Sequence, residues 1–488
     1  MNGVSAMILA LSAPFAGAIL VALSHRKPNQ RETMTIVSAV VLFLAVLSIV
    51  PDVLAGSFPR LELFGVLPGL SVAFAVEPLG MLFALVASFL WIVNSLYSIG
   101  YMRGNDERNQ TRFYVCFAVA LGSTMGVAFA ANMFTLFVFY ELLTLSTYPL
   151  VTHKGTQEAT AAGRTYIGLL LGTSIVFLIS AMVGTLFVAG DLEFTPGGLL
   201  AGKIDGPEVA ILLALYVFGI GKAAVMPVHR WLPAAMVAPT PVSALLHAVA
   251  VVKAGVFTVV KVVVYIFGVD TLAGSGNAGW LVWVAGFTVL AASIVALRQD
   301  NLKRRLAYST ISQLSYVVLA AAILTPISIV GAALHIAAHA FGKITLFFAA
   351  GSIYTAAHLT EVSELDGIGR RMPWTMGAFA VGALTMIGLP PTGGFLGKWF
   401  MLSGAMADGQ WLPVSIIVAS TLLNAAYFMP IVYAAFWRAP PKGASAHPPH
   451  GEAPWPIVAA LVTTAVASFA LFFFPGVPLA LAWLLAGG

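Results

Sequence analysis

Residues 221–241 read GKAAVMPVHRWLPAAMVAPTP, a mostly apolar stretch that carries Lys222 and several interior prolines. A second stretch, GLPPTGGFLGKW from Gly388, likewise joins prolines and glycines to a lysine, Lys398. Proline removes a helical hydrogen bond and clashes with the preceding turn, so each stretch predicts a broken helix. Within a bilayer such a break persists only where protein or water surrounds it. Both stretches therefore predict a shielded, polar interior.

The rest of the chain supplies apolar surroundings for these breaks. Of its 488 residues, 60% are hydrophobic and only 9% are charged. A soluble domain carries about 25% charged residues, so this chain cannot cover a water-facing surface, and the bilayer must be its main solvent. The apolar segments run almost without interruption and no linker divides them. We therefore expect an all-α membrane protein in which residues 1–488 form a single polytopic domain.

A helix that spans a bilayer needs about 20 mainly apolar residues. By this length the chain has about 14 predicted spans, with the seventh and twelfth broken. Matching breaks in two halves are typical of inverted repeats in transporters. Because the breaks are five spans apart, we expect two inverted five-helix repeats, at about residues 113–267 and 279–437. The spans lie at about residues 4–23, 33–51, 75–100, 113–131, 133–152, 163–190, 208–237, 241–267, 279–297, 304–324, 326–354, 372–406, 411–437 and 455–485.

The charged loops predict an orientation for these spans. If the N-terminus lies outside, 16 of the 24 lysines and arginines fall in cytoplasmic loops, and the outer loops hold only Arg60 and Lys203. Such a separation follows the positive-inside rule and predicts a multi-pass protein of the bacterial inner membrane. The net charge of +5 is spread over short loops. It therefore gives no reason to expect nucleic acid as a partner.

Four lysines within predicted spans are the strongest functional signal: Lys222, Lys253, Lys343 and Lys398. A charge at mid-bilayer costs about 2.5–3.5 kcal/mol on insertion scales, so the four together cost roughly 10–14 kcal/mol. Leucine would pack better at each position, so a function in moving protons or cations is the simplest explanation. Lys261 lies nearer the outer end of its span, where a lysine can also extend its ammonium to the interface.

Glu141 is the only acid well inside a predicted span. A lone buried carboxylate would take up a proton unless a cation stabilised its charge. We expect Lys222 to be that cation, as part of a proton path or as a purely structural ion pair.

Three residues of one predicted helix, His335, His339 and Lys343, recur at intervals of four and share one face. Imidazole titrates near neutral pH, so this file can pass protons along the helix. Zinc is the alternative ligand for the two histidines, but a third ligand is missing, and we expect no metal. His247 lies one turn after Ser243 in the eighth span, either as a proton carrier or as an ordinary buried histidine.

No cofactor is predicted. The single cysteine, Cys116, cannot hold an iron–sulfur cluster alone. The lysines that follow glycine lack the Ser or Thr of a phosphate-binding loop, and no G-x-G-x-x-G occurs. His447 and His450, in a predicted Pro-rich connector at residues 438–454, lack further metal ligands.

Four stretches together resemble the antiporter-like membrane subunits of respiratory complex I, energy-converting hydrogenases and Mrp-type cation/proton antiporters. Over nearly the whole chain, they occur in the same order as the family's spans 7–8, 10, 11 and 12. They are MPVHRWLPAAMVAPTPVSALLHA from Met226, RQDNLKRRLAYSTISQLSY from Arg298, HIAAHAFGKITLFFAAG from His335 and GLPPTGGFLGKW from Gly388.

The resemblance implies 14 spans, inverted repeats and a central polar axis. It implies that Glu141 and Lys222 form a modulating ion pair and that Lys253 is the central proton carrier. Lys343 and its histidines would connect the two halves, and Lys398 would carry protons on the exit side.

Within this family the chain most resembles the D-type subunit of Mrp antiporters, since some complex I relatives carry glutamate where this chain has Lys398. The alternatives are a proton-pumping subunit of a complex I-like NADH-quinone oxidoreductase or membrane-bound hydrogenase, and a membrane subunit of an inorganic-carbon uptake system. A redox enzyme with its own quinone site and an inert scaffold are the alternatives from other classes. We expect a transporter subunit rather than a stand-alone enzyme. Its expected partners are other membrane subunits, the lipid bilayer, protons and, if it is an antiporter, Na⁺.

Overall fold

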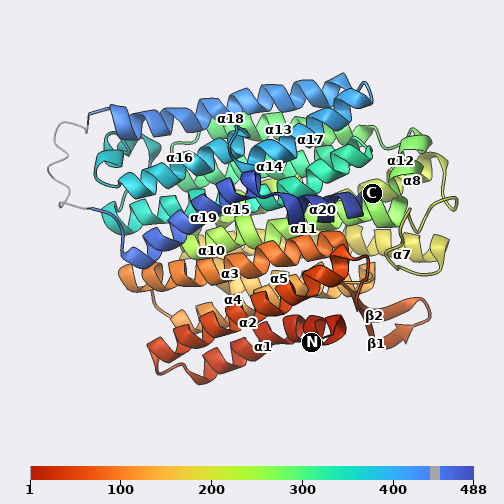
Figure 1. Cartoon of the computed structure of the whole chain (residues 1–488), viewed down its shortest axis with the longest axis horizontal. Coiled ribbons are helices and arrows are strands. Elements are labelled where there is room, and N and C mark those ends of the chain that lie inside the picture. Colours follow the sequence, from red (N-terminus) through yellow and green to blue (C-terminus); the bar gives the residue numbers. More distant parts are fainter. Residues whose placement is uncertain (1, 440–450, 488) are drawn as a thin grey trace.

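The computed structural model describes residues 2–439 and 451–487, apart from the side chain of His247. The predicted connector's His447 and His450 lie outside the described residues. Figure 1 shows a bundle of long helices lying side by side, with α1 and α2 at one edge and α18 at the opposite edge.

Among the described residues, helices account for almost all of the regular structure, and one antiparallel hairpin accounts for the rest. The helices are α1 (Gly3–Leu23), α2 (Pro28–Leu54), α3 (Pro78–Gly104), α4 (Gln110–Ala128), α5 (Met133–Val151), α6 (Gln157–Thr173), α7 (Ile179–Ala189), α8 (Gly206–Gly219), α9 (Trp231–Ala234), α10 (Thr240–Ala244), α11 (Val251–Lys261), α12 (Val269–Ser275), α13 (Trp280–Leu297), α14 (Leu302–Ala322), α15 (Pro326–Ala357), α16 (Pro373–Ile387), α17 (Gly393–Ala407), α18 (Trp411–Trp437), α19 (Trp455–Phe473) and α20 (Gly476–Leu485). The strands are β1 (Arg60–Leu67) and β2 (Leu70–Ala75).

Ten helices in the described part of the chain are long and apolar enough to cross a membrane, or 11 if the bent pair 251–267 and 269–275 is one span. Large apolar side chains such as Phe187, Trp283 and Leu422 are exposed on the periphery. Lipid is the solvent that such a surface suits, because water would penalise it. The described residues therefore form a multi-pass helical membrane protein, although the predicted total of 14 spans is not confirmed.

Both predicted breaks are present. The seventh predicted span ends as a helix at Gly219, and two single turns separate α8 from α9. The twelfth ends at Ile387, where Gly388 adopts a left-handed φ of 84° that only glycine accepts easily. Two prolines follow, and α17 starts again at Gly393. A further break at residues 474–475, between α19 and α20, divides the fourteenth predicted span and was not predicted.

The hairpin lies at one end of the bundle, beside the loop between α7 and α8 (Figure 1). Main-chain bridges join Phe74 of β2 to Ala130, and Asn132 to Glu193. At residues 60–75 the polar and aromatic residues alternate too irregularly to predict a strand. The two strands bond to each other, and β2 also bonds to the loop between α4 and α5, which is a tertiary contact.

Candidate functional site

The centre of the bundle joins α11 to α15 through a direct side-chain contact. The Lys253 ammonium lies within hydrogen-bond distance of Nδ1 of His339. Both residues are buried. Gly255, two residues further along α11, lets this helix approach the main chain of Lys222 and Ala223 closely. The broken segment after α8, α11 and α15 thus meet around Lys253.

Lys222 lies in the break and points toward one face of α5. Its ammonium donates hydrogen bonds to the Tyr140 carbonyl (2.8 Å) and to Thr144 Oγ1 (2.6 Å), and it lies 3.1 Å from the centre of the Tyr140 ring. Residues 140 and 144 share a helix face, whereas residue 141 lies about 100° around the helix. The direct ion pair that we expected between Lys222 and Glu141 is therefore not formed within 4 Å.

Glu141 is nonetheless placed to act on Lys222 through space. Both carboxylate oxygens are buried and have no hydrogen-bond partner in the described structure. The carboxylate is close enough for its charge to act on the Lys222 ammonium. A buried charge without a direct partner is costly, so any change in its distance from Lys222 has a large electrostatic effect.

Lys343 starts a chain of hydrogen bonds between α15, α14 and α18. Its ammonium donates to Ser309 Oγ (2.7 Å), which also accepts from the Tyr427 hydroxyl (2.9 Å). Tyr427 and the Asn424 side-chain oxygen form a further hydrogen bond. The Asn424 amide points to the Met386 carbonyl at the end of α16. This series of hydrogen bonds therefore extends from Lys343 to the end of α16, at the second helix break.

His335 reaches the same carbonyl from the other side. Its Nε2 lies 2.9 Å from Oε1 of Gln313, and the Gln313 amide donates to the Met386 carbonyl (3.2 Å). The rings of His335 and His339 follow each other along α15, tilted by 33° and with centroids 6.2 Å apart. The predicted alignment of the histidines on one helix face is present, and it continues the path toward α16.

Lys398 lies in the second turn of α17, and its side chain reaches back across the break to the end of α16. Its ammonium donates to the Ile387 carbonyl, the last of α16 (2.8 Å), and to Thr421 Oγ1 (3.1 Å). The C-terminal carbonyls of a helix carry partial negative charge, so this position favours a cation. An open cavity of about 180 Å³ lies beside Lys398 and Thr421, and most of its lining is apolar, including the exposed side chains of Trp399 and Leu422.

The structure therefore brings most predicted residues onto one polar axis within the bundle. Lys222 and Glu141 lie at one end, Lys253, His339 and Lys343 in the middle, and Lys398 at the other. The side chain of His247, in the π-helical turn Leu245–Val249, is not described. No cluster of metal-ligating side chains occurs among residues 2–439 and 451–487.

A second buried pair lies near the hairpin. The Lys261 ammonium is 2.8 Å from the Glu77 carboxylate, donates to the Ala130 carbonyl (3.0 Å) and lies 3.8 Å from the Phe194 ring centre. Lys261 is therefore paired inside the protein and does not extend to the interface. Glu77, at the start of its span, gave no sequence signal of this partner 184 positions away.

Breaking this pair should destabilise the protein strongly. Glu77→Gln leaves the buried Lys261 ammonium without its counter-charge, and removing one partner of a buried pair costs about 3–5 kcal/mol. We expect a clearly lower thermal unfolding midpoint for the purified protein. Asp366→Asn is the matched control, because its pair with the exposed Arg438 (3.4 Å) is worth at most about 1 kcal/mol. Equal midpoints for the two variants would contradict a stabilising role of the Glu77–Lys261 pair.

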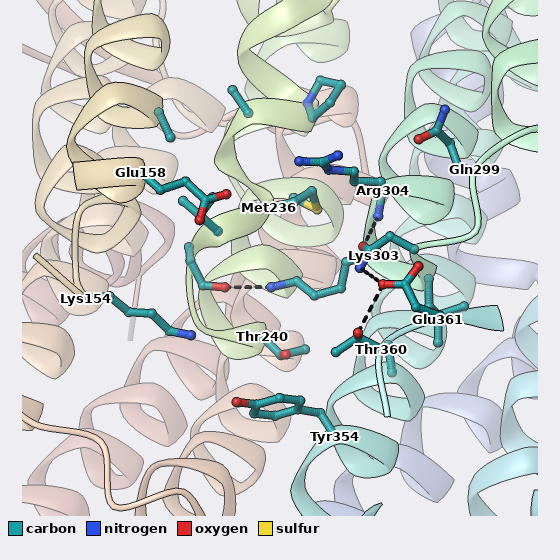
Figure 2. A pocket seen from close by; sticks show the side chains of 18 of the residues that line it. Lys154, Glu158, Met236, Thr240, Gln299, Lys303, Arg304, Tyr354, Thr360 and Glu361 are labelled. Atoms are coloured by element: carbon teal, nitrogen blue, oxygen red, sulfur yellow. Dashed lines mark hydrogen bonds between the residues drawn. The ribbon is translucent and has the colours of Figure 1, made fainter. Parts of the chain in front are cut away.

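A cavity of about 1030 Å³ lies at the end of the bundle that carries the basic loops, among α6, the α9–α10 segment, α14 and α15. Figure 2 shows charged side chains of both signs around it, among them Lys154, Glu158 and Arg304. Lys303 crosses it to donate to the Ala238 carbonyl (2.6 Å). Burial raises the pKa of Glu107 in the adjacent loop, and Lys154 and Lys303 partly offset the rise.

Residues 130–424 match the family model described as "NADH:quinone oxidoreductase/Mrp antiporter, TM". The chain is 34% identical to NADH-quinone oxidoreductase subunit N of Desulforudis audaxviator over 91% of its own length and 88% of that protein's. Other curated relatives are longer, and the chain spans 43% to 62% of them.

Two solved structures share the fold. One chain of the Mrp complex from Dietzia sp. DQ12-45-1b aligns with a TM-score of 0.87 and 22% identity, covering 99% of this chain and 97% of that one. One chain of an archaeal membrane-bound sulfane sulfur reductase aligns with a TM-score of 0.86 and 24% identity, covering 99% and 96%.

Proposed function

This chain belongs to the NADH:quinone oxidoreductase/Mrp antiporter transmembrane family, and from this premise we propose that it moves protons across the bilayer within a multisubunit complex. It is an antiporter-like membrane subunit, and its relatives are subunits of respiratory or cation/proton antiport complexes. The proposal concerns which of its residues carry protons and which complex it serves.

One observation carries the proposal: four buried lysines lie along one polar axis with histidines and hydroxyls between them. Lys253 contacts His339, and Lys343 is linked through side chains to the carbonyl end of α16, next to Lys398. An ammonium that is surrounded by apolar residues and carbonyls can hold or release a proton according to the charges nearby. A proton arriving at one lysine therefore favours release from the next.

We assign roles along this axis. Glu141 and Lys222 set the charge at the first break, through space rather than through a direct ion pair. Lys253 is the central carrier, His247, His335, His339 and Lys343 connect the halves, and Lys398 releases protons at the second break. The two five-helix repeats of a 14-span domain, at about residues 113–267 and 279–437, would place the breaks in antiparallel helices.

Two kinds of multisubunit complex are each supported by one specific observation. The lysine at the second break favours the D-type position of an Mrp antiporter. The 34% identity with an NADH-quinone oxidoreductase subunit over 88% of its length favours a redox-driven pump. We place both in the inner membrane of a bacterium, with Na⁺ or K⁺ as the exchanged ion in the antiporter.

The two are separated by purifying the complex in mild detergent and assaying inside-out vesicles with a pH-sensitive dye. An antiporter dissipates an imposed pH gradient when Na⁺ or K⁺ is added, and the chain co-purifies with other cation/proton antiporter subunits. A redox pump builds a gradient when an electron donor is added, and redox subunits co-purify. Vesicles in which neither treatment moves protons would contradict proton translocation.

Glu141→Gln should lower transport by about tenfold, which corresponds to about 1.4 kcal/mol in the barrier. Glutamine keeps the size of the side chain but removes the charge that acts on Lys222. Glu208→Gln, at an exposed position in α8, is the control and should transport normally. The measurement is the initial rate of proton movement per amount of assembled complex. A native rate for Glu141→Gln would remove Glu141 from the proposed path.

A further inference from the structure

Helix α3 carries buried polar side-chain atoms that have no hydrogen-bond partner among the described residues. Nε1 of Trp91, both polar side-chain atoms of Asn94 and Oγ of Ser95 have no hydrogen-bond partner in the described residues. The three residues form one stripe along the helix. Neighbouring Ser98 satisfies its hydroxyl on the Asn94 carbonyl (2.6 Å). Buried polar groups in native proteins nearly always have partners, and water commonly supplies the missing ones.

Two contacts fix where Asn94 lies along the bundle. Phe83 of α3 packs against Phe257 of α11 with ring centroids 5.2 Å apart, and Tyr101 lies beside Thr240 at the start of α10, where both line one cavity. Helix α3 and the α10–α11 segment therefore run antiparallel side by side. Asn94 lies about two turns before Tyr101 and on the same face. It is thus level with the π-helical turn Leu245–Val249, which α3 contacts.

The α10 segment and the π-helical turn that face α3 also combine irregular geometry with a polar side chain that is unpaired among the described residues. A π-helical turn widens a helix and often marks a functional site. Ser243, just before this turn, is fully buried, and its Oγ has no partner in the described structure. Unsatisfied polar atoms therefore lie on both α3 and α10 next to one irregular turn.

Asn94 and Ser243 lie between a large cavity and Lys253, which are two parts of the proposed proton path. Tyr101 and Thr240 line the cavity of about 1030 Å³. Lys253 follows the π-helical turn on the other side. We propose that Asn94, together with Ser243, holds ordered water between α3 and the π-helical turn, and that this water connects the cavity to Lys253. The inference rests on the proposed function for its role in transport, whereas the hydration itself does not.

The chemistry of the amide suits this role. A primary amide offers two donors and an acceptor, so it can orient a water for proton transfer in either direction. It does not titrate, and so it does not carry the proton itself. Asn94 is a positioning residue, and Lys253 remains the group that takes up the proton.

Asn94→Leu tests the role in transport. Leucine has the same branched shape, with methyl groups in place of the amide oxygen and nitrogen, and replacing buried polar groups by apolar groups of the same shape is nearly neutral or stabilising for folding. We expect proton movement in vesicles to fall by about tenfold or more, with the thermal midpoint and the assembly unchanged. Asn94→Ser should recover much of the rate, because its hydroxyl binds water and the lost volume leaves room for it. Native transport by Asn94→Leu, or loss of transport and of thermal stability in both variants, would overturn the proposal.

Cysteine labelling tests the hydration without any transport assay. Asn94→Cys, in a Cys116→Ala background, should react with a small water-soluble methanethiosulfonate added to inside-out vesicles, because only a hydrated thiol forms the reactive thiolate readily. Val93→Cys is the control, since Val93 is buried and shares a face with Gly100, which packs on Ile457 of α19.

The labelling also separates the two proposals. Reaction at position 94 and not at 93 supports the hydration site. An unreactive residue 94, or equal reaction at both positions, contradicts it. If Lys253 carries no protons, the labelling at 94 persists while the function proposed for the axis fails.

Discussion

Lys253→Ala should abolish proton movement by the assembled complex, with a fall of about 100-fold or more. Lys253 is 1% exposed and contacts His339 across the centre of the bundle. Alanine would leave a gap in the axis between the first break and α15, with no side chain there to hold a proton. The measurement is the initial rate of dye response in inside-out vesicles, divided by the amount of complex recovered from the same membranes.

Lys253→Arg sharpens this test. Arginine keeps the positive charge and much of the length of lysine, but it cannot be deprotonated in proteins. A proton carrier must release its proton, so we expect this variant to be as inactive as Lys253→Ala. Lys203→Ala, in an exposed loop, is the control that should transport normally. Native transport by Lys253→Arg would mean that the residue supplies a fixed charge and does not carry protons.

The breaks in the seventh and twelfth spans were predicted because their causes are local, whereas the break at residues 474–475 was missed although Pro475 and Gly476 mark it in the same way. Proline and glycine act on the backbone of their own segment. The helix breaks after Gly219 and Ile387 can therefore be predicted from the prolines and glycines that follow these residues. The buried lysines were equally visible, because the cost of a charge in a bilayer depends mainly on its depth. Both features depend only on the residues of a single span.

Contacts between distant segments were less predictable. We expected Lys222 to pair with Glu141. Instead, the Tyr140 carbonyl and the Thr144 hydroxyl, on the face of α5 that points toward Lys222, accept hydrogen bonds from its ammonium. Glu77 and Lys261 pair across 184 positions, and nothing in either segment signals the other. The hydrogen bonds of Ala73 and Ala75 in β2 to the loop between α4 and α5 are likewise contacts between separate segments.

Some of the missed connectors did leave a signal. Ser309 and Gln313 are four residues apart in α14 and so share a face, in a segment that also supplies many apolar side chains. Polar residues at that spacing in a buried helix indicate a hydrogen-bonded seam. Tyr427, which bonds to Ser309, and Asn424, which bonds to Tyr427, are three residues apart in α18 and repeat the signal.

A similarly large loss of transport is expected when Lys398, beside the second helix break, is replaced. Lys398→Met should lower transport to background, because methionine fills a similar space but cannot bind a proton. Lys398 is 4% exposed, and its ammonium is held by the Ile387 carbonyl and Thr421. Met401, one turn further along α17, provides a control: Met401→Leu changes an equally buried position of the same helix without touching the axis. It should transport normally.

Lys398→Glu distinguishes proton carriage from charge at this break. A glutamate can also bind and release a proton, so some transport should survive, in contrast to Lys398→Met. It should remain below the native rate, because the Ile387 carbonyl, at the negative end of α16, disfavours an ionised carboxylate. The expected order of rates is therefore lysine, then glutamate, then methionine, measured in the same vesicles. If glutamate and methionine are equally inactive, the break requires a cation, and Lys398 anchors the end of α16 instead of passing protons.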